Sequence, residues 1–458
     1  MKKGRYFVLI SSISLLFIIV TAFIMAGSPK EKAVEDPVKI YNDAISAAET
    51  DTGSYNVLQT ENIKIGDETY IRKTDATVCC KRSESQITEL YVEKQCRIND
   101  HSYKIFTFFK DNTLYTSVNG TLFSTKTSQN EAVSRNIPME LLTPTVYGTV
   151  VGIETKEEII IQFTDALEAE KWLPEITLNK AEGTAVISKE NIIKSLSYSA
   201  EFKSNAYQTQ TEVTVTPLPS PAQFPVLKCD NAIEITHPDA PVILEEACGF
   251  ILSSKTLNSR YSHSILCGTF GDKQTQSIQV SVLGDDPWTA GIETEVSLEN
   301  TGKIGNNSHI IKSELFENGI YRVSLNNSEF EEDKTVSKQK FITQYQNILI
   351  STVMLPEHID ACESEYTDGT LLLKYIANDA FTEQIKLDAC EKLYGDPDVL
   401  KNQYEDYTTN ESYCYIKVDP ATGIPFASGF HYAGTYTINE ISYELKYTAD
   451  QIYDLTDN

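Results

Sequence analysis

Few residues of this chain have the types and spacing that catalysis requires. Ser337 and Lys340 match Ser-x-x-Lys, in which a lysine accompanies the serine nucleophile of penicillin-recognising enzymes. The companion Ser-Asp-Asn and Lys-Thr-Gly elements of those enzymes are missing. The sequence also lacks a His-Glu-x-x-His motif, a nucleophile elbow, a phosphate-binding loop, a dinucleotide fingerprint and an EF-hand spacing. We therefore interpret the serine–lysine pair as a chance match on a polar helix face.

Histidine and cysteine give no pattern of metal ligands. The six histidines are scattered, with no pair at the spacing of neighbours on a helix or strand. The nine cysteines include no Cys-x-x-Cys, which argues against a zinc ribbon or a redox dithiol. Their odd number leaves at least one thiol free or paired between chains, and the sequence leaves open whether the others are buried thiols or disulfides. We predict no catalytic residue, no metal, no cofactor and no enzyme activity, although a pair of glycosidase carboxylates depends on separation in space and leaves no mark in a sequence.

The formal net charge of −26 over 458 residues argues against one class of partner. A field of that sign repels nucleic acid and membrane surfaces rich in anionic head groups. Apolar residues make up 41% of the chain and charged residues 23%, which are the proportions of a globular protein. Tyrosine, threonine, isoleucine and valine are frequent, and this composition favours β-strands.

The N-terminus predicts export and attachment to a membrane. Residues 1–6 include three basic side chains, and residues 7–27 carry no charge. An apolar stretch of about 20 residues is long enough to cross the hydrocarbon core, and the basic flank stays inside the cell. We therefore expect a cytoplasmic tail at 1–6, one transmembrane helix at 7–27 and a linker at 28–36, with the bulk of the chain on the extracytoplasmic side of the cell membrane. A cleaved signal peptide is the alternative.

A proline-rich segment divides the exported part near its middle. Four prolines lie between positions 217 and 225. Closely spaced prolines hold an extended path and act as a spacer. We expect a linker at 217–240 between a first domain at 37–216 and a second domain at 241–458, each large enough to bury its own core.

The two halves repeat one order of features. Asp36 and Asp239 each precede a proline and an amphipathic stretch, which indicates the start of a capped helix. A block that begins at Phe109, and again at Phe316, predicts a turn, a strand, a tight turn and a second strand. The tight turns are Asn119–Gly120 and Asn326–Asn327. Each half closes with alternating apolar and polar residues, typical of strands with one buried face, so we predict an internal duplication.

This order of helix, antiparallel meander, middle helical stretch and closing hairpin resembles a superfamily of extracytoplasmic lipid carriers. The superfamily includes the lipoprotein-localisation factor LolA, the mycobacterial lipoproteins LppX and LprG, and related domains of low-GC Gram-positive bacteria. The blocks at Phe109 and Phe316 are most similar to those domains. The resemblance implies an α+β fold in two tandem domains, each a curved antiparallel sheet that forms a half-barrel with helices over its concave face. The chain differs from the lipoprotein members because it lacks a cysteine for a lipid anchor and has two copies, which argues against a shuttling carrier.

The function that we predict is binding of an apolar or lipid-like ligand in a groove between sheet and helices. Six apolar side chains from the strands and the leading helix are expected to line the groove. These are Phe109, Phe123, Phe163, Phe202, Val38 and Ile45. A solid core made of the same side chains is the simpler alternative. The alternative function is a module that binds a surface protein or cell-wall material and takes no small ligand.

Overall fold

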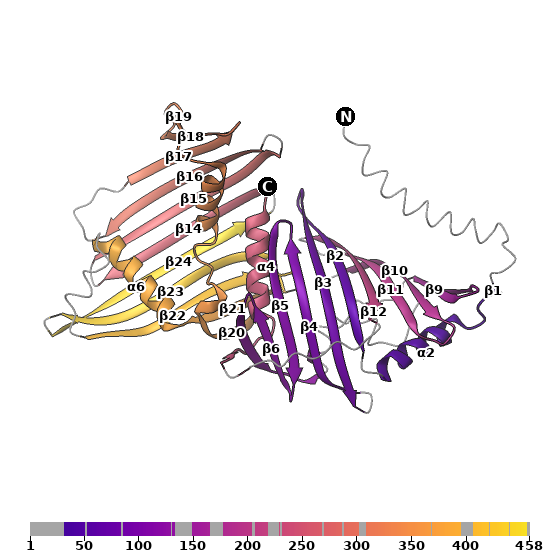
Figure 1. Cartoon of the computed structure of the whole chain (residues 1–458). Helices are drawn as coiled ribbons and strands as arrows, with labels where there is room; N and C mark the ends of the chain where they lie inside the picture. The colour runs from indigo at the N-terminus through magenta and orange to yellow at the C-terminus, as the bar shows by residue number, and fades with distance from the viewer. Residues whose placement is uncertain are drawn as a thin grey trace.

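A computed structural model describes the chain between residues 32 and 455, with gaps. The described ranges are 32–50, 53–83, 86–129, 131–132, 149–164, 177–203, 207–218, 229, 231–267, 270–285, 288–301, 308–367, 369–394, 406–420, 422–438 and 440–455. Within these ranges 65% of the residues lie in β-strands and 17% in helices. The strands form two large sheets that lie beside each other (Figure 1).

The first sheet has thirteen strands in the order β1-β8-β9-β10-β11-β12-β2-β3-β4-β5-β6-β7-β13. They are β1 (Lys32–Ala33), β2 (Ser54–Ile65), β3 (Glu68–Ser83), β4 (Gln86–Ile98), β5 (His101–Lys110), β6 (Thr113–Val118), β7 (Thr121–Lys126), β8 (Thr149–Glu154), β9 (Glu158–Thr164), β10 (Thr177–Ser188), β11 (Ile193–Lys203), β12 (Gln208–Pro217) and β13 (Ile233–Glu234). Neighbouring strands run antiparallel except β13, which pairs with β7 in parallel.

The second sheet has eleven strands in the order β19-β18-β17-β16-β15-β14-β24-β23-β22-β21-β20. They are β14 (Thr256–Cys267), β15 (Phe270–Asp285), β16 (Trp288–Thr301), β17 (Ser308–Glu317), β18 (Ile320–Leu325), β19 (Glu331–Asp333), β20 (Ile359–Thr367), β21 (Thr370–Ala377), β22 (Asp406–Val418), β23 (Pro425–Ile438) and β24 (Ile441–Asp454). All neighbours in this sheet run antiparallel.

The two sheets share one strand order. If β2 is matched with β14, every strand from β2 to β12 has a counterpart from β14 to β24, and in both sheets the first strand of the set pairs with the last. The hairpins after β5 and β17 turn at Asp111–Asn112 and Asn318–Gly319, where all four residues have positive φ. The predicted tight turns Asn119–Gly120 and Asn326–Asn327 follow the matched strands β6 and β18, again with positive φ. Such turns fit the right-handed twist of neighbouring strands, and their shared positions support the predicted duplication.

Four α-helices and one short 3₁₀ helix accompany the sheets in the described ranges. They are α2 (Pro37–Thr50), α4 (Ala240–Ser253), α5 (Lys338–Leu349), α6 (Asp379–Tyr394) and the 3₁₀ helix η3 (Pro356–His358). Asp36 caps α2 as predicted, because its carboxylate accepts a 2.9 Å hydrogen bond from the Lys39 backbone N–H. Asp239 stands at the start of α4 without a side-chain capping bond. Ser337 caps α5 by accepting from the backbone N–H of Lys340, so the Ser-x-x-Lys pair has a structural role at a helix start.

The predicted α+β class is wrong, because the chain is mostly β. Strands of up to 16 residues take up most of the described chain, and the helices are too few to cover either sheet. Helix α2 packs on β8, β10 and β11, whereas α4 packs on β4, β5, β6 and β23. The predicted leading helices are present as α2 and α4, but long strands with alternating apolar and polar residues dominate the fold.

No helix in the described ranges is long and apolar enough to span a membrane. The predicted cytoplasmic tail at 1–6 and the predicted transmembrane segment at 7–27 lie outside those ranges.

Helix α4 lies between the two sheets and packs on both (Figure 1). Strand β13 joins their edges, since it pairs with β7 while the next residues bond to β20. The backbone N–H and the hydroxyl of Thr236 both donate to the Cys362 carbonyl, the latter at 2.7 Å. The segment between the halves thus contributes strand β13 to their contact, and α4, the first helix of the second half, adds to it.

Candidate binding site on the inner face of the first sheet

The predicted groove residues do not all meet at one place. Phe109 and Phe163 are buried in one apolar cluster on the first sheet, whereas Phe123 is buried in another with α4 and the second sheet. Val38 lies half-buried on α2. The two remaining side chains, those of Phe202 and Ile45, lie outside the described part. Contact of any of the six with a ligand stays a prediction.

Buried side chains join α2 to one face of the first sheet, which we name the inner face. This first apolar cluster includes Tyr41, Ala44, Tyr55, Val57, Ala76, Val78, Cys80, Leu90, Val92, Phe109, Leu114, Ile161, Phe163, Leu196, Val213 and Val215. Strand alternation places these residues on a single face, because every second side chain of a strand points the same way. The Tyr41 and Phe163 rings lie 5.8 Å apart between their centres and tie the helix to β9.

A second set of apolar side chains on the same face belongs to both halves of the chain. This shared cluster includes Ile63, Ile65, Tyr70, Ile98, Tyr103 and Ile105 of the first sheet, Phe250 and Ile251 of α4, and Leu257, Ile278, Val280, Phe316, Phe341 and Tyr453 of the second half. The Tyr70 and Phe250 rings meet edge to face at 5.2 Å. The first and second halves therefore share one core at this end of the first sheet.

Between these two clusters the inner face is polar. We name this strip the polar belt; it consists of Gln59, Glu61, Arg72, Thr74, Lys94, Thr107 and Thr116. Glu61 pairs with Arg72 and Gln59 with Thr74 across β2 and β3. Thr107 pairs with Thr116 across β5 and β6. The belt runs diagonally over the strands, so that the inner face changes from apolar to polar and back to apolar.

Arg72 is the most heavily bonded cation of the polar belt. Its guanidinium lies 2.5 Å from the Glu61 carboxylate and 3.2 Å from that of Glu246 on α4, and it donates to the Thr422 carbonyl at 3.0 Å. Burial alone would lower the pKa of Arg72, but the two carboxylates outweigh it, so the pKa is raised and the charge is kept. Burial raises the pKa of Glu246, and Arg72 opposes that rise. Tyr103 also donates to Glu246, at 3.2 Å.

Lys94 is the second cation of the polar belt and differs from Arg72. Its cross-strand neighbours Ala76 and Ile105 are buried and apolar. Burial lowers the pKa of Lys94. In the part of the chain that the structure describes, its ammonium makes no hydrogen bond or ion pair.

The sequence prediction overlooked the polar belt, although β4 contains a signal. Leu90, Val92, Cys96 and Ile98 alternate as an inward apolar series, and Lys94 interrupts it. A charged residue at an inward position of a strand is costly and therefore marks a place of interest. Arg72 interrupts β3 in the same way. Glu246 gave no such signal, because its partner lies in the other half of the chain.

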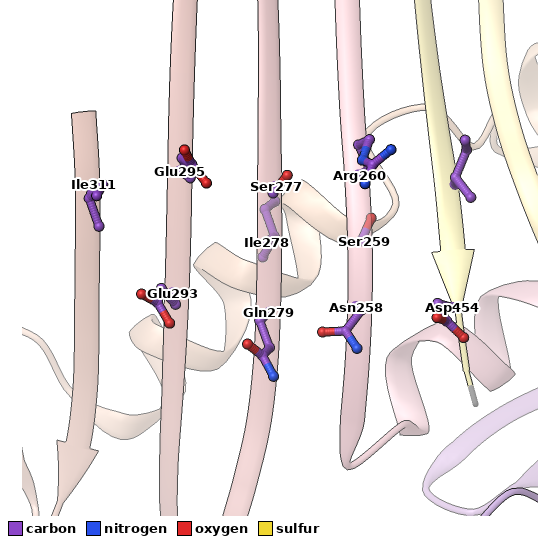
Figure 2. A pocket seen from close by; sticks show the side chains of 11 residues that line it. Asn258, Ser259, Arg260, Ser277, Ile278, Gln279, Glu293, Glu295, Ile311 and Asp454 are labelled. Atoms are coloured by element: carbon purple, nitrogen blue, oxygen red, sulfur yellow. The ribbon is translucent and has the colours of Figure 1, made fainter. Parts of the chain in front are cut away.

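The outer face of the second sheet has a hollow of about 480 Å³. Figure 2 shows two rows of side chains across its strands: Arg260, Ser277, Glu295 and Ile311 in one row, and Asp454, Asn258, Gln279 and Glu293 in the next. This outer hollow is open, most of the residues that line it are of polar types, and it lies on the opposite side of the sheet from the apolar clusters. It has the character of a contact surface for polar groups.

Four cysteines of the described ranges are free thiols: Cys96, Cys248, Cys362 and Cys414. Burial raises the pKa of Cys362 to about 12, with a smaller effect from the Glu363 carboxylate. Thiols of this kind stay protonated at neutral pH and are poor nucleophiles and metal ligands. No three His, Cys, Asp or Glu side chains of the described ranges gather closely enough to hold a metal ion.

Comparison with known proteins gives structural likenesses only. No protein-family model and no curated protein matches the chain. Part of it is similar to LprF from Mycobacterium bovis, with 11% identity and a TM-score of 0.25 over 43% of this chain and 98% of that one. It is also similar to CghA, solved with Sch210972, at 7% identity over 88% of both chains with a TM-score of 0.13. OpdO of Pseudomonas aeruginosa aligns at 7% identity over 88% of this chain and 96% of its own, with a TM-score of 0.12. Since these scores are all below 0.5, the likenesses carry no argument about fold or function.

Proposed function

We propose that the chain is an extracytoplasmic binding protein that takes a lipid-like or other apolar ligand on the inner face of the first sheet, beneath α2. The observation that carries the proposal is the composition of that face. A wide apolar cluster with several aromatic rings adjoins a polar belt, which is the arrangement that an amphiphilic ligand requires. The apolar sequence at 7–27 behind a basic N-terminus supports a place outside the cytoplasm.

Helix α2 is a weakly held cover for such a site. Among its side chains from Pro37 to Ala44, Tyr41 and Ala44 are buried, whereas the others are half-buried or exposed. The side-chain amide oxygen Oδ1 of Asn42 is buried without a hydrogen-bond partner in the described ranges. An unsatisfied buried oxygen costs about 1–3 kcal/mol, which favours states in which α2 lifts and exposes the oxygen to water. A ligand that enters beneath the helix would use this opening.

Native mass spectrometry of the full chain tests the proposal. The protein would be purified in a mild detergent, which is then removed, and its intact mass compared before and after extraction with organic solvent. A bound ligand gives an added mass of several hundred daltons that extraction removes. A mass equal to that of the bare chain, with no uptake when palmitate is added, would overturn the proposal.

An engineered disulfide that immobilises α2 gives a second test of the same proposal. The Val34 and Gly152 backbones already meet through a 3.0 Å hydrogen bond beside the start of α2. A disulfide between a cysteine introduced at Val38 and one introduced on a strand that α2 packs on would fix the helix against the sheet. Uptake of palmitate should fall under oxidising conditions and return after reduction. Equal uptake in both states would show that the ligand does not enter beneath α2.

A second candidate function is an interaction module without a small ligand, which the outer hollow favours. Glu293, Glu295 and Asp454 give that surface an acidic character, with Arg260 as a single cation. If the full chain carries no ligand and takes up no palmitate, this candidate is the better account.

A further inference from the structure

Lys94 stands at the boundary between the apolar and polar parts of the inner face. On β4 it follows Val92 of the first apolar cluster and precedes Cys96 of the shared cluster. Its diagonal neighbours on the adjoining strands are Thr74 and Thr107, whose hydroxyl groups belong to the polar belt. Diagonal neighbours in a sheet are within reach of a long side chain. The lysine therefore has hydroxyl groups on two sides and apolar surface along its length.

The carboxylates of this region are already occupied by other groups. Glu61 bonds to Arg72, and Glu246 bonds to Arg72 and to Tyr103. Lys81 and Lys104 of this sheet have carboxylate partners, Glu89 at 2.5 Å and Glu93 at 2.6 Å, whereas Lys64 and Lys73 are exposed to water. In the described ranges, by contrast, the Lys94 ammonium makes no hydrogen bond or ion pair, although the Glu246 charge attracts it.

Lys94 is half-buried, and the carboxylate whose charge attracts it, that of Glu246, is already bonded to Arg72. An ammonium in such a place without an anion of its own is unfavourable for folding. An apolar residue of similar length would fill the same place at lower cost, because its cross-strand neighbours Ala76 and Ile105 are apolar. The cost is offset if an anion from outside the chain completes the pair. An amphiphile that lies on the first apolar cluster would bring its head group to this point.

We propose that Lys94 binds the anionic head group of an amphiphile whose apolar chain lies on the first apolar cluster. This inference rests on the proposed function and specifies the ligand class. A carboxylate and a phosphate share the required chemistry, which is an anionic oxygen within hydrogen-bond distance of the ammonium, with Thr74 and Thr107 as additional donors. The net charge of −26 does not oppose this contact, since charges beyond about 8–10 Å are largely screened and Lys94 dominates locally.

The test compares three probes with the same 16-carbon chain: palmitate, hexadecyl phosphate and hexadecanol. Binding to the full chain is measured at pH 7 by equilibrium dialysis, for the natural protein and for K94M, K94Q and the control K73M. Lys73 is exposed on the opposite face of the neighbouring strand β3. Because a hydrogen bond between charged groups is strong, the natural protein should bind at least one anionic probe roughly tenfold or more tightly than hexadecanol. The anionic probe that binds more tightly identifies the head-group chemistry.

K94M and K94Q should bind all three probes about equally, with unchanged affinity for hexadecanol, whereas K73M should behave as the natural protein does. K94M should also raise the melting temperature of the ligand-free chain, because an unpaired cation is removed. A lysine with a purely structural role would give a lower melting temperature. If K94M and K94Q keep the preference for the anionic probe, the inference is wrong and the proposed function stands. If the natural protein binds none of the probes, the proposed function fails and the inference fails with it.

Discussion

Helices α2 and α4 occupy matching places at the start of the two halves, yet their burial is very different. Over its first eight residues, helix α4 buries six, which are Ala240, Pro241, Ile243, Leu244, Glu245 and Ala247. Over the matching stretch from Pro37 to Ala44, helix α2 buries Tyr41 and Ala44. One helix is fixed between two sheets, whereas the other rests on a single sheet.

The difference indicates which half of the chain can open. Glu245 on α4 accepts from the Asn119 side chain at 2.8 Å and lies 3.3 Å from His101, so polar contacts add to its apolar packing. On the second sheet, several buried polar side chains of the face that carries the apolar clusters are uncharged and hydrogen-bond to one another. Gln451 bonds to Thr352 and Ser259, and Ser428 bonds to Tyr453. By contrast, the first sheet has a weakly held helix and a cation, Lys94, whose ammonium makes no hydrogen bond or ion pair in the described ranges, which is why we place the ligand there.

Loss of the Phe250 ring should have the largest effect on stability. The side chain is fully buried in the shared cluster, so F250A leaves a cavity in the core of both halves. We expect a loss of about 3–5 kcal/mol of unfolding free energy in urea titrations. The control F330A removes a ring that is 49% exposed and should change stability by about 0.5 kcal/mol or less. Equal effects of the two variants would show that α4 does not hold the halves together.

Removal of the Arg72 guanidinium should have the next largest effect. R72M leaves Glu61 and Glu246 without their cation in a poorly solvated place, and should cost about 3 kcal/mol. The exposed pair of Arg322 and Glu332 provides the control, and R322M should cost about 1 kcal/mol or less. The added substitution E246Q should recover part of the loss in R72M. A double variant less stable than R72M would contradict a direct pairing between the two residues.

Substitution of Asn42 should stabilise α2 and so reduce the difference in stability between α2 and α4. N42A removes the unsatisfied oxygen and adds a strong helix former, so we expect a gain of about 1 kcal/mol. Hydrogen exchange of the α2 amides should slow, and uptake of palmitate should slow with it. The same measurement on α4 serves as an internal control and should not change. Faster exchange in α2 would contradict the view that this oxygen loosens the helix.

High pH should lower the stability of the second half through its buried thiols. We expect this to be the smallest of the four effects. Burial raises the pKa of Cys362 to about 12, above its ordinary value of 9.0. A group whose folded pKa is raised contributes stability that is complete below pH 9 and is lost as the pH rises toward 12. The melting temperature should therefore fall across that window, and less steeply in C362A. Parallel curves for the two proteins would show that this thiol is not the cause.

Sequence reasoning succeeded where local chemistry decides the structure. The turns at Asn119–Gly120 and Asn326–Asn327 need positive φ, which Asn and Gly tolerate, so their types alone predict them. The cap at Asp36 is also local. These features involve neighbours within a few positions along the chain.

Features that join distant parts of the chain could not be predicted in the same way. Glu246 and Arg72 lie 174 positions apart, and only the fold brings them together. The role of α4 between the sheets had a weak signal, since apolar residues lie around the whole helix and not along one stripe. That pattern indicates that the helix is buried on all sides, but it does not identify the elements that bury it. The α+β expectation failed because a resemblance in the order of elements does not determine how long each strand continues.

The most direct test of the account locates the ligand itself. A palmitate analogue with a photoreactive diazirine in its chain would be bound to the full protein, activated by light, and mapped by peptide mass spectrometry. We predict labelled peptides from α2 and from β2 to β5, with labelling suppressed by unlabelled palmitate. Labelling confined to the second sheet, or labelling that palmitate does not suppress, would contradict the proposal that the inner face of the first sheet binds the ligand.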